Sequence, residues 1–374
     1  MQKGTYKLHD EANFNFQLNR TIMWGDGDLQ ELSKIAKKIV TTENWVNEFT
    51  QLAQKVERNN EIAKAISYYR MAEFFEFEGS PNKDRLYKQS RELFYEYNKT
   101  IFDEDIQLDY VEYENSQMPV WICIPKTKII DTIVLHGGND SYMEEFLPMV
   151  QYLMQNGFAV YLFDGPGQGT ALRTYNLYFT HKWEKPVKAI LDKYNLNDIT
   201  LIGLSLGGML APRAAAFEKR IKRVVAWGIM PSFYDVLLSK SPSILNTLMN
   251  LKQKCLINFL LRIKMKREPI AKWGILHGLH SMNVKTPYDY VKKTQDFEMT
   301  SIGAKIKQDF MLIGASEDHF IPVNMYKDVI KSLPNVKSLT FRIFTKYENA
   351  ENHCSLGNTE LVLRCIVEWI KNAK

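Results

Sequence analysis

The sequence predicts an α/β fold in which helices cover both faces of a mostly parallel sheet, with a helical amino-terminal region and a helical insertion. Three observations predict it. Short apolar runs alternate with segments of helical periodicity between residues 106 and 230, the alternation stops between 231 and 302, and it resumes from 303. Such alternation is typical of βαβ units whose parallel strands are buried on both faces.

The length of 374 residues exceeds the roughly 250 to 300 residues at which single hydrophobic cores stop growing. We therefore expect four segments. They are a helical amino-terminal region (1–105), the first part of the core (106–230), a helical cap insertion (231–302) and the second part of the core (303–374).

Residues 1–105 predict helices because apolar side chains recur there at helical spacing, as at Leu29, Leu32 and Ile35 and again at Trp45, Phe49, Leu52 and Val56. Two further aromatic helices are expected over 62–78 and 84–97. The turn Gly79-Ser80-Pro81-Asn82 separates them, since Gly and Pro end one helix and begin the next.

The core elements follow in order. Alternating residues at 108–113 and 119–124 predict a hairpin whose loop holds Asn115-Ser116-Gln117. Later apolar runs predict strands at 129–135, 159–163, 199–204, 224–227, 310–313 and 338–344, and helical patterns fill 142–156, 182–194, 324–332 and 359–372. After 204, small residues around Ala214 predict a helix that packs tightly on the sheet, with Pro212 in its first turns or at a kink.

Composition predicts a cytoplasmic protein without membrane insertion. The first thirty residues have no signal-peptide pattern, and no apolar run approaches the roughly 18 residues that span a bilayer. Cys123, Cys255, Cys354 and Cys365 lack C-x-x-C spacing, which suits a reducing compartment. No His, Cys, Asp and Glu cluster has metal-ligand spacing, so we expect neither a metal nor an organic cofactor.

The positive charge is local. The net charge is +5, and residues 252–272 hold seven Lys or Arg and one Glu. Apolar residues interleave with these cations, so the stretch is open to interpretation as a nucleic-acid or membrane patch. The favoured interpretation is an amphipathic helix with its apolar side inward, and we expect no nucleic-acid partner.

Gly203-Leu204-Ser205-Leu206-Gly207 follows an apolar strand and precedes the small-residue helix. In this context G-x-S-x-G predicts a nucleophile elbow, because the glycines remove Cβ atoms where strand and helix backbones meet and leave the serine strained and exposed. A serine hydroxyl is a weak nucleophile at neutral pH, so it needs a histidine base and an orienting carboxylate.

Two later loops at strand ends can supply these partners. Asp318 lies just past 310–313 with Pro322 behind it, and this spacing favours Asp318 over its neighbour Glu317 as the acid. His353 lies after the strand 338–344. It is the only histidine that follows Asp318 in the sequence apart from the adjacent His319, and we therefore assign it as the base.

The oxyanion of an acyl-transfer intermediate needs aimed N–H donors. We expect one from the backbone of Leu206 and another from Gly138 or Asn139 in His136-Gly137-Gly138-Asn139, where His136 is structural. The glycine-rich 163–169 lacks the spacing of phosphate-binding loops and predicts a tight turn beside the site.

These motifs together resemble the α/β-hydrolase superfamily. A narrower resemblance is to the carbon-carbon hydrolases typified by 2,6-dihydroxypseudooxynicotine hydrolase and the fungal yellowish-green polyketide-shortening hydrolases. Three segments carry this resemblance: Phe163 to Gly169, Gly203 to Gly208 with 211–216, and Glu351-Asn352-His353-Cys354. The helical segment 66–73 matches as well. The resemblance implies the triad Ser205, Asp318 and His353 and a homodimer. It also implies an acidic residue shortly after the sixth strand, for which Asp235 and Tyr234 are the nearest candidates.

The sequence thus predicts a serine hydrolase that forms an acyl-enzyme on a small carbonyl substrate, either an ester or a ketone with a scissile carbon-carbon bond. An acyltransferase or thioesterase that uses the same acyl-enzyme remains open. A non-catalytic, ligand-binding use of the fold is the third interpretation. Residues 231–302, rich in Met and Phe, are expected to wall an apolar pocket.

Overall fold

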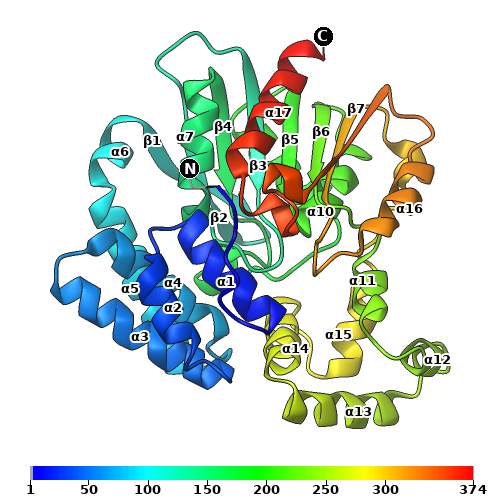
Figure 1. Cartoon of the computed structure of the whole chain (residues 1–374). Helices are drawn as coiled ribbons and strands as arrows, with labels where there is room; N and C mark the ends of the chain where they lie inside the picture. Colours follow the sequence, from blue (N-terminus) through cyan, green and yellow to red (C-terminus); the bar gives the residue numbers. More distant parts are fainter. Residues whose placement is uncertain (1–2, 374) are drawn as a thin grey trace. The chain divides into compact units, whose positions relative to one another are not determined.

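The computed structural model describes residues 3–373 and divides into two compact units. We call them the helical unit, which is the chain up to Glu104 together with Gln253–Tyr290, and the sheet unit, which is Asp105–Lys252 and the chain from Val291 onward. Figure 1 shows the course of the chain. These units do not have the boundaries of the four expected segments, among which the cap spans 231–302. The expected division into core and cap stays a prediction.

The sheet unit is built on an eight-stranded sheet, counted over the described residues. Its strands are β1 (Ile106–Tyr113), β2 (Ser116–Cys123), β3 (Asp131–His136), β4 (Phe158–Phe163), β5 (Ile199–Leu204), β6 (Ile221–Trp227), β7 (Asp309–Ala315) and β8 (Ser338–Phe344). Their order is β1-β2-β4-β3-β5-β6-β7-β8, and only the β1–β2 and β2–β4 pairs are antiparallel. This confirms the predicted mostly parallel sheet.

Several strand boundaries differ from the prediction, and two of the differences have a clear physical cause. The hairpin loop is the pair Glu114-Asn115, both at positive φ, and Ser116 already pairs with Tyr113. Such a two-residue turn matches the right-handed twist of the strands. Strand β3 begins at Asp131, because Ile129 and Ile130 are exposed despite their apolar side chains.

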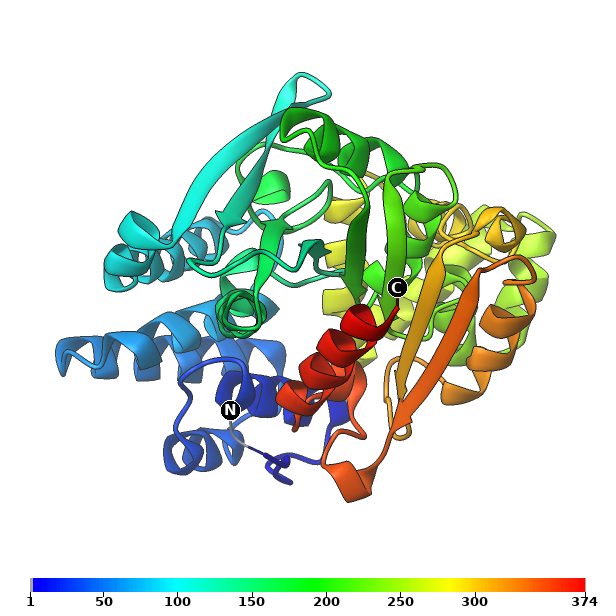
Figure 2. The same ribbon diagram turned by 90° about the horizontal axis from the view of Figure 1, so that it is seen from above.

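Helices cover both faces of this sheet (Figure 2). Helices α7 (Leu147–Gln155) and α17 (Thr359–Asn372) lie against each other on one face, and α9 (Glu184–Lys193) and α10 (Gly207–Ala215) lie on the opposite face. Pro212 lies inside α10. The remaining helices of the unit are α8 (Gly169–Arg173), α11 (Phe233–Ser239), α12 (Ile244–Asn250) and α16 (Tyr326–Lys331).

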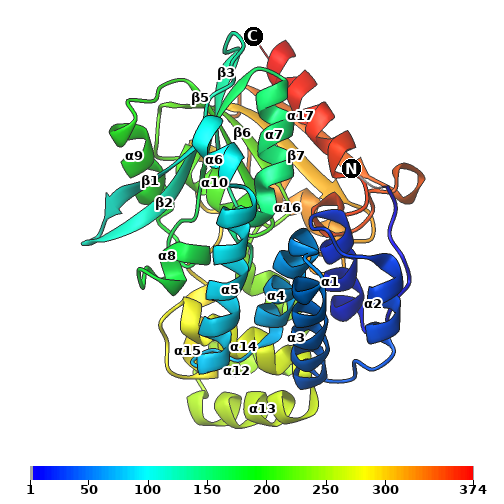
Figure 3. The ribbon, with the colours of Figure 1, turned by 90° about the vertical axis from the view of Figure 1, so that its left-hand side faces the viewer.

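The helical unit contains α1 (Ala12–Met23), α2 (Leu29–Ala36), α3 (Thr42–Arg58), α4 (Ile62–Phe75), α5 (Pro81–Tyr97), α6 (Lys99–Glu104), α13 (Lys254–Arg267), α14 (Pro269–Ser281) and α15 (Pro287–Thr294, which runs past the unit's boundary). Helices α3, α4 and α5 pack side by side (Figure 3). Trp45 of α3 is fully buried, stacks on Phe14, meets the Phe75 ring edge-on, and donates its indole N–H to the Met71 carbonyl at 2.6 Å.

Helix α14 comes from the expected cap segment but packs within the helical unit. The indole N–H of Trp273 donates to the Phe74 carbonyl at 2.6 Å, and the two rings stack with centroids 4.7 Å apart. This bond satisfies a carbonyl at the carboxyl end of α4, where the helix itself leaves such groups unpaired. Contacts between side chains far apart in sequence therefore decide where this segment packs.

Helix α13 contradicts the expectation of an amphipathic helix with its apolar side inward. Of its residues only Ile257 is buried, whereas Leu256, Phe259 and Leu260 are 44, 61 and 39% exposed. The helix has apolar residues on two faces, and periodicity alone cannot tell which of two faces packs inward.

Over residues 3–373, no helix combines the length and hydropathy needed to cross a bilayer.

Candidate active site

Ser205 occupies the sharp turn between β5 and α10 and has a φ of 59°, a left-handed conformation that is costly for a residue with a Cβ. Its N–H donates to the Trp227 carbonyl of β6 at 2.9 Å. Glycines make the turn feasible. A Cβ on Gly203 would lie 2.1 Å from the Gly207 carbonyl oxygen, and one on Gly208 would lie 2.6 Å from that of Gly228.

His353 lies in the segment after β8 and is buried. Its Nε2 is 2.8 Å from the Ser205 Oγ, and its Nδ1 is 2.7 Å from Oδ2 of Asp318. A Phe320 ring stands edge-on to the imidazole, with centroids 4.9 Å apart. The structure thus brings the expected serine, histidine and aspartate into one hydrogen-bonded chain.

Asp318 follows β7 and is held by its own loop. Its Oδ1 accepts the backbone N–H groups of Phe320 and Ile321 at 2.8 and 2.9 Å, which leaves Oδ2 for His353. Burial opposes ionisation, but the His353 charge and these hydrogen bonds outweigh it and lower the pKa of Asp318. Glu317 is exposed, and its N–H donates to the Glu351 carbonyl.

The pKa of the His353 imidazole shifts in the opposite direction, upward. Burial by itself lowers the pKa of His353, and the Asp318 carboxylate more than offsets this, so that the pKa of His353 lies well above its usual 6.5. The carboxylate also fixes the tautomer, because an Nδ1–H that donates to Asp318 leaves Nε2 as the acceptor that faces Ser205.

The loop after β3 lies directly against the elbow. A Cβ on Gly138 would be 2.8 Å from the Ser205 Cβ and 2.9 Å from the Leu206 N, so only glycine allows this approach. The N–H of Gly138 donates to the Ser141 Oγ at 3.1 Å. The expected donors are Leu206 and either Gly138 or Asn139. Gly138 lies directly against Leu206, although its N–H is bonded to Ser141, and Asn139 is the next residue of the same loop.

Gln168 fixes this loop, and the sequence did not indicate it. The side chain is 1% exposed, and its Nε2 donates to the Gly137 and Gly138 carbonyls at 2.8 and 3.0 Å while its Oε1 accepts the Gly165 N–H at 2.9 Å. The available signal was the glycine-rich turn 163–169, which was expected to border the site. One amide thus joins the loops after β3 and β4.

His136 has a structural position, as expected. It is fully buried, accepts the Trp183 indole N–H at its Nε2 (3.1 Å), and its Nδ1 lies 2.9 Å from the Gly137 carbonyl. Burial lowers the pKa of His136 to about 4, so the ring is neutral near pH 7. A neutral ring suits both bonds, since Nδ1–H then donates to Gly137 and Nε2 accepts.

Asp235, the candidate accessory acid, lies elsewhere in the sheet unit. It is exposed in the first turn of α11 and lines a cavity of about 410 Å³ with Asp328, Lys331 and other residues. It is not part of the hydrogen-bonded series formed by Ser205, His353 and Asp318.

Within residues 3–373, no group of three or more His, Cys, Asp or Glu side chains is arranged to hold a metal ion.

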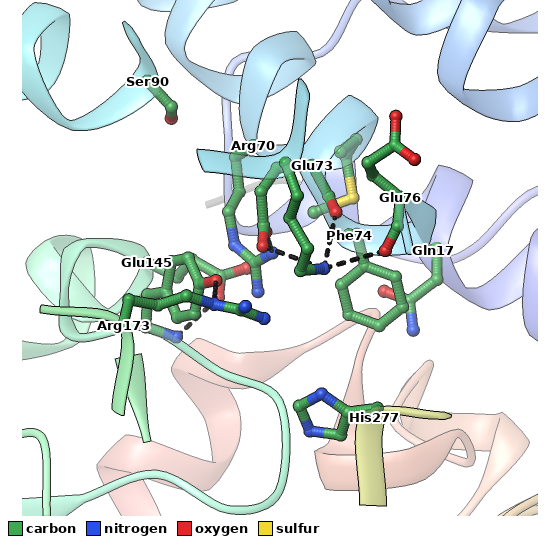
Figure 4. Close-up of polar contacts among 12 residues, drawn as sticks. Gln17, Arg70, Glu73, Phe74, Glu76, Ser90, Glu145, Arg173 and His277 are labelled. Carbon is green, nitrogen blue, oxygen red and sulfur yellow. Dashed lines mark hydrogen bonds and ion pairs between the residues drawn. The ribbon is translucent and has the colours of Figure 1, made fainter. Parts of the chain in front are cut away.

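The helical unit buries a second polar cluster around the carboxyl end of α4 (Figure 4). Arg70 pairs with Glu73 at 2.6 Å, and Lys83 of α5, 1% exposed, lies 3.0 Å from the same carboxylate. The Lys83 ammonium also donates to the carbonyls of Glu73 and Glu76 at 3.0 and 3.1 Å. A cation at a helix carboxyl end complements the helix dipole.

Comparison with known proteins gives concordant results. A profile for the alpha/beta hydrolase fold matches residues 133–254. The chain is 26% identical over 329 residues to the hydrolase LUC6 of Fusarium sp (78% of each chain) and 25% identical over 356 residues to the 20-hydroxy-prefusarin hydrolase FUS2 of Gibberella moniliformis (84% of each).

Solved structures show the same fold. The 2,6-dihydroxy-pseudo-oxynicotine hydrolase aligns with a TM-score of 0.68 at 18% identity, over 95% of each chain. The protein AbyA5 aligns with a TM-score of 0.70 at 16% identity, over 96% of this chain and 95% of its own.

Proposed function

We propose that this chain, which has the fold of an α/β hydrolase and hydrolases among its relatives, is a serine hydrolase that works through an acyl-enzyme. The observation that carries the proposal is the chain of hydrogen bonds from Asp318 through His353 to a Ser205 held at positive φ. These three groups have the roles of orienting acid, base and nucleophile.

In the proposed reaction, His353 Nε2 takes the proton of the Ser205 hydroxyl as Oγ attacks a carbonyl carbon. The tetrahedral oxyanion receives the N–H groups of Leu206 and of Gly138 or Asn139. When the intermediate collapses, the bond to the leaving group breaks and His353 returns its proton to that group, an alkoxide or an enolate. His353 then takes a proton from water as the water attacks the acyl-enzyme. The bond between the acyl carbon and Ser205 Oγ breaks, His353 returns the proton to Oγ, and the acid is released.

Fluorophosphonate labelling tests the nucleophile. A fluorophosphonate is attacked by an activated serine and stays attached, so the wild-type protein should label and Ser205→Ala should not. Ser241→Ala is a matched control because its hydroxyl, on the loop after α11, donates to the Leu237 carbonyl at 2.9 Å. Wild-type protein that labels no faster than Ser205→Ala contradicts the proposal.

The triad does not decide which bond is cleaved, and the relatives are named only as hydrolases. A carbon-carbon bond and an ester bond are the two candidates, and Asp235 is proposed as an accessory acid for carbon-carbon cleavage. Turnover of aryl esters, acyl thioesters and β-diketones separates these cases. If Asp235→Asn reduces β-diketone cleavage and spares ester hydrolysis, the acid takes part; equal effects on both remove it from the mechanism.

An acyltransferase or thioesterase is the second candidate, since the same acyl-enzyme can be passed to an alcohol, amine or thiol. Product analysis with and without such acceptors distinguishes transfer from hydrolysis. The non-catalytic interpretation is excluded by any turnover that Ser205→Ala abolishes. We further propose that the protein is a homodimer, which sedimentation would check, and that it is cytoplasmic, which cell fractionation would check. We also propose that residues 231–302 form an apolar wall of the substrate pocket. A deletion of this segment, assayed on several substrates, would check that.

A further inference from the structure

Helix α13 exposes an apolar face that the rest of the described chain leaves uncovered. Leu256, Phe259, Leu260 and Ile263 recur at the spacing of one helix face, and the first three are exposed while Ile263 is half-buried. The opposite face, with Ile257, Leu261 and Met265, is buried or half-buried. We call the first set the outer face of α13.

Cations border this outer face. Helix α13 carries Lys254, Arg262, Lys264, Lys266 and Arg267, and it carries no Asp or Glu. By helical periodicity, Arg262 and Lys266 lie along one edge of the outer face, Lys264 lies along the other, and Arg267 lies at its end. Within residues 3–373, Arg262, Lys266 and Arg267 form no ion pair, and all three are exposed.

From this arrangement we propose that α13 docks the protein on an anionic lipid surface. Apolar side chains on one helix face gain free energy by entering the boundary between headgroups and acyl chains, and flanking Lys and Arg side chains reach the lipid phosphates. The helix lies in the plane of the interface and does not cross the membrane.

Charge favours this occupant over a second copy of the chain. Two α13 helices face to face would bring like charges together across the interface, which is repulsive. A nucleic acid would satisfy the cations but would leave the Leu and Phe side chains in water. An anionic bilayer matches both the apolar residues and the cations that flank them.

Co-sedimentation with vesicles tests the proposal. The wild-type protein should bind equimolar phosphatidylglycerol and phosphatidylcholine vesicles, bind pure phosphatidylcholine much less, and be released by roughly 0.5 M NaCl, which screens the attraction. The triple variant Arg262→Gln, Lys266→Gln, Arg267→Gln should bind the anionic vesicles about a hundred-fold more weakly, since each basic residue contributes roughly five-fold.

Matched variants separate location from net charge. Lys88→Gln, Lys128→Gln and Lys307→Gln remove the same charge from exposed positions elsewhere and should leave vesicle binding unchanged. The apolar pair Leu256→Ser and Phe259→Ser should weaken binding at low salt, whereas Val40→Ser with Tyr347→Ser, also exposed, should not. Thermal unfolding should be the same in all variants.

Three results overturn the proposal. They are a wild-type protein that binds neither vesicle, whether or not it binds an oligonucleotide, equal binding to both vesicles, and equal loss in the α13 and control triples. Sedimentation velocity adds a fourth. If Leu256→Ser with Phe259→Ser turns a dimer into a monomer and leaves vesicle binding intact, the outer face is covered by a second copy of the chain.

Discussion

Oδ2 of Asp318 lies 2.7 Å from Nδ1 of His353, and both side chains are largely buried. The carboxylate raises the pKa of His353 above 6.5, outweighing the opposite effect of burial, while the pKa of Asp318 falls. This pair therefore sets the pH range in which a base at Nε2 is available.

The first prediction concerns pH dependence. A base must be unprotonated, so kcat/KM should fall as the pH drops through the raised pKa of His353, and the acid limb of the profile should lie above pH 6.5. Asp318→Asn removes the charge that raises this pKa. Its acid limb should move to lower pH, and kcat should drop about 10,000-fold, as in other triads that lose their acid.

Glu317→Gln is the matched control for that experiment, because Glu317 is the neighbouring carboxylate and is exposed. Its profile should match the wild type. If Glu317→Gln shifts the limb and Asp318→Asn does not, the assignment of the acid is wrong.

The second prediction concerns Gln168. Gln168→Ala leaves the Gly137 and Gly138 carbonyls without their amide donor, so the loop that carries the proposed oxyanion donors should loosen. We expect kcat to fall about ten-fold or more with KM little changed, and the free energy of unfolding to fall by about 1 to 3 kcal/mol. Steady-state kinetics and urea unfolding measure both.

A second glutamine separates the two effects. Gln308 donates to the Ala215 carbonyl at 2.8 Å, away from the elbow, so Gln308→Ala should lower stability without a selective loss of kcat. Equal kcat losses in the two variants would mean that Gln168 acts only through global stability.

The third prediction concerns Gly138. In Gly138→Ala the new Cβ would lie 2.8 Å from the Ser205 Cβ, closer than real Cβ contacts, so the loop or the elbow must shift. We expect kcat to drop about 100-fold, because a displacement near 1 Å at a catalytic site has that effect. Gly274→Ala has open space around its Cβ in α14 and should leave kcat unchanged. Normal turnover by Gly138→Ala would show that this approach is unimportant for catalysis.

The fourth prediction concerns the buried Lys83. Lys83→Met leaves the Glu73 carboxylate with one buried cation fewer and removes the ammonium donor from the Glu73 and Glu76 carbonyls. Removing one partner of a buried pair destabilises proteins by about 3 to 5 kcal/mol. Lys88→Met, at an exposed position of the same helix, should change the free energy of unfolding by less than about 0.5 kcal/mol. Chemical denaturation followed by tryptophan fluorescence compares the two, and equal values would show that the cluster contributes little.

Much of the fold was predictable because strands and helices leave periodic patterns. The parallel direction of strands β3 to β8 follows from the alternation of strands and helices, and the hairpin β1–β2 follows from its composition. Its loop was placed wrongly, since Glu114 is not a typical residue for a turn at positive φ.

The sequence by itself determined the α/β class, the elbow at Ser205, and the two loops that carry Asp318 and His353, because motifs and strand ends are local. Only the tertiary structure decided which hydrogen bonds join residues that are far apart in the sequence. The Gln168 amide meets carbonyls 30 and 31 residues away, and Trp273 meets α4 from 199 residues away. It also decided which apolar face of α13 is exposed, because periodicity identifies the faces of a helix, whereas packing selects the one that is buried.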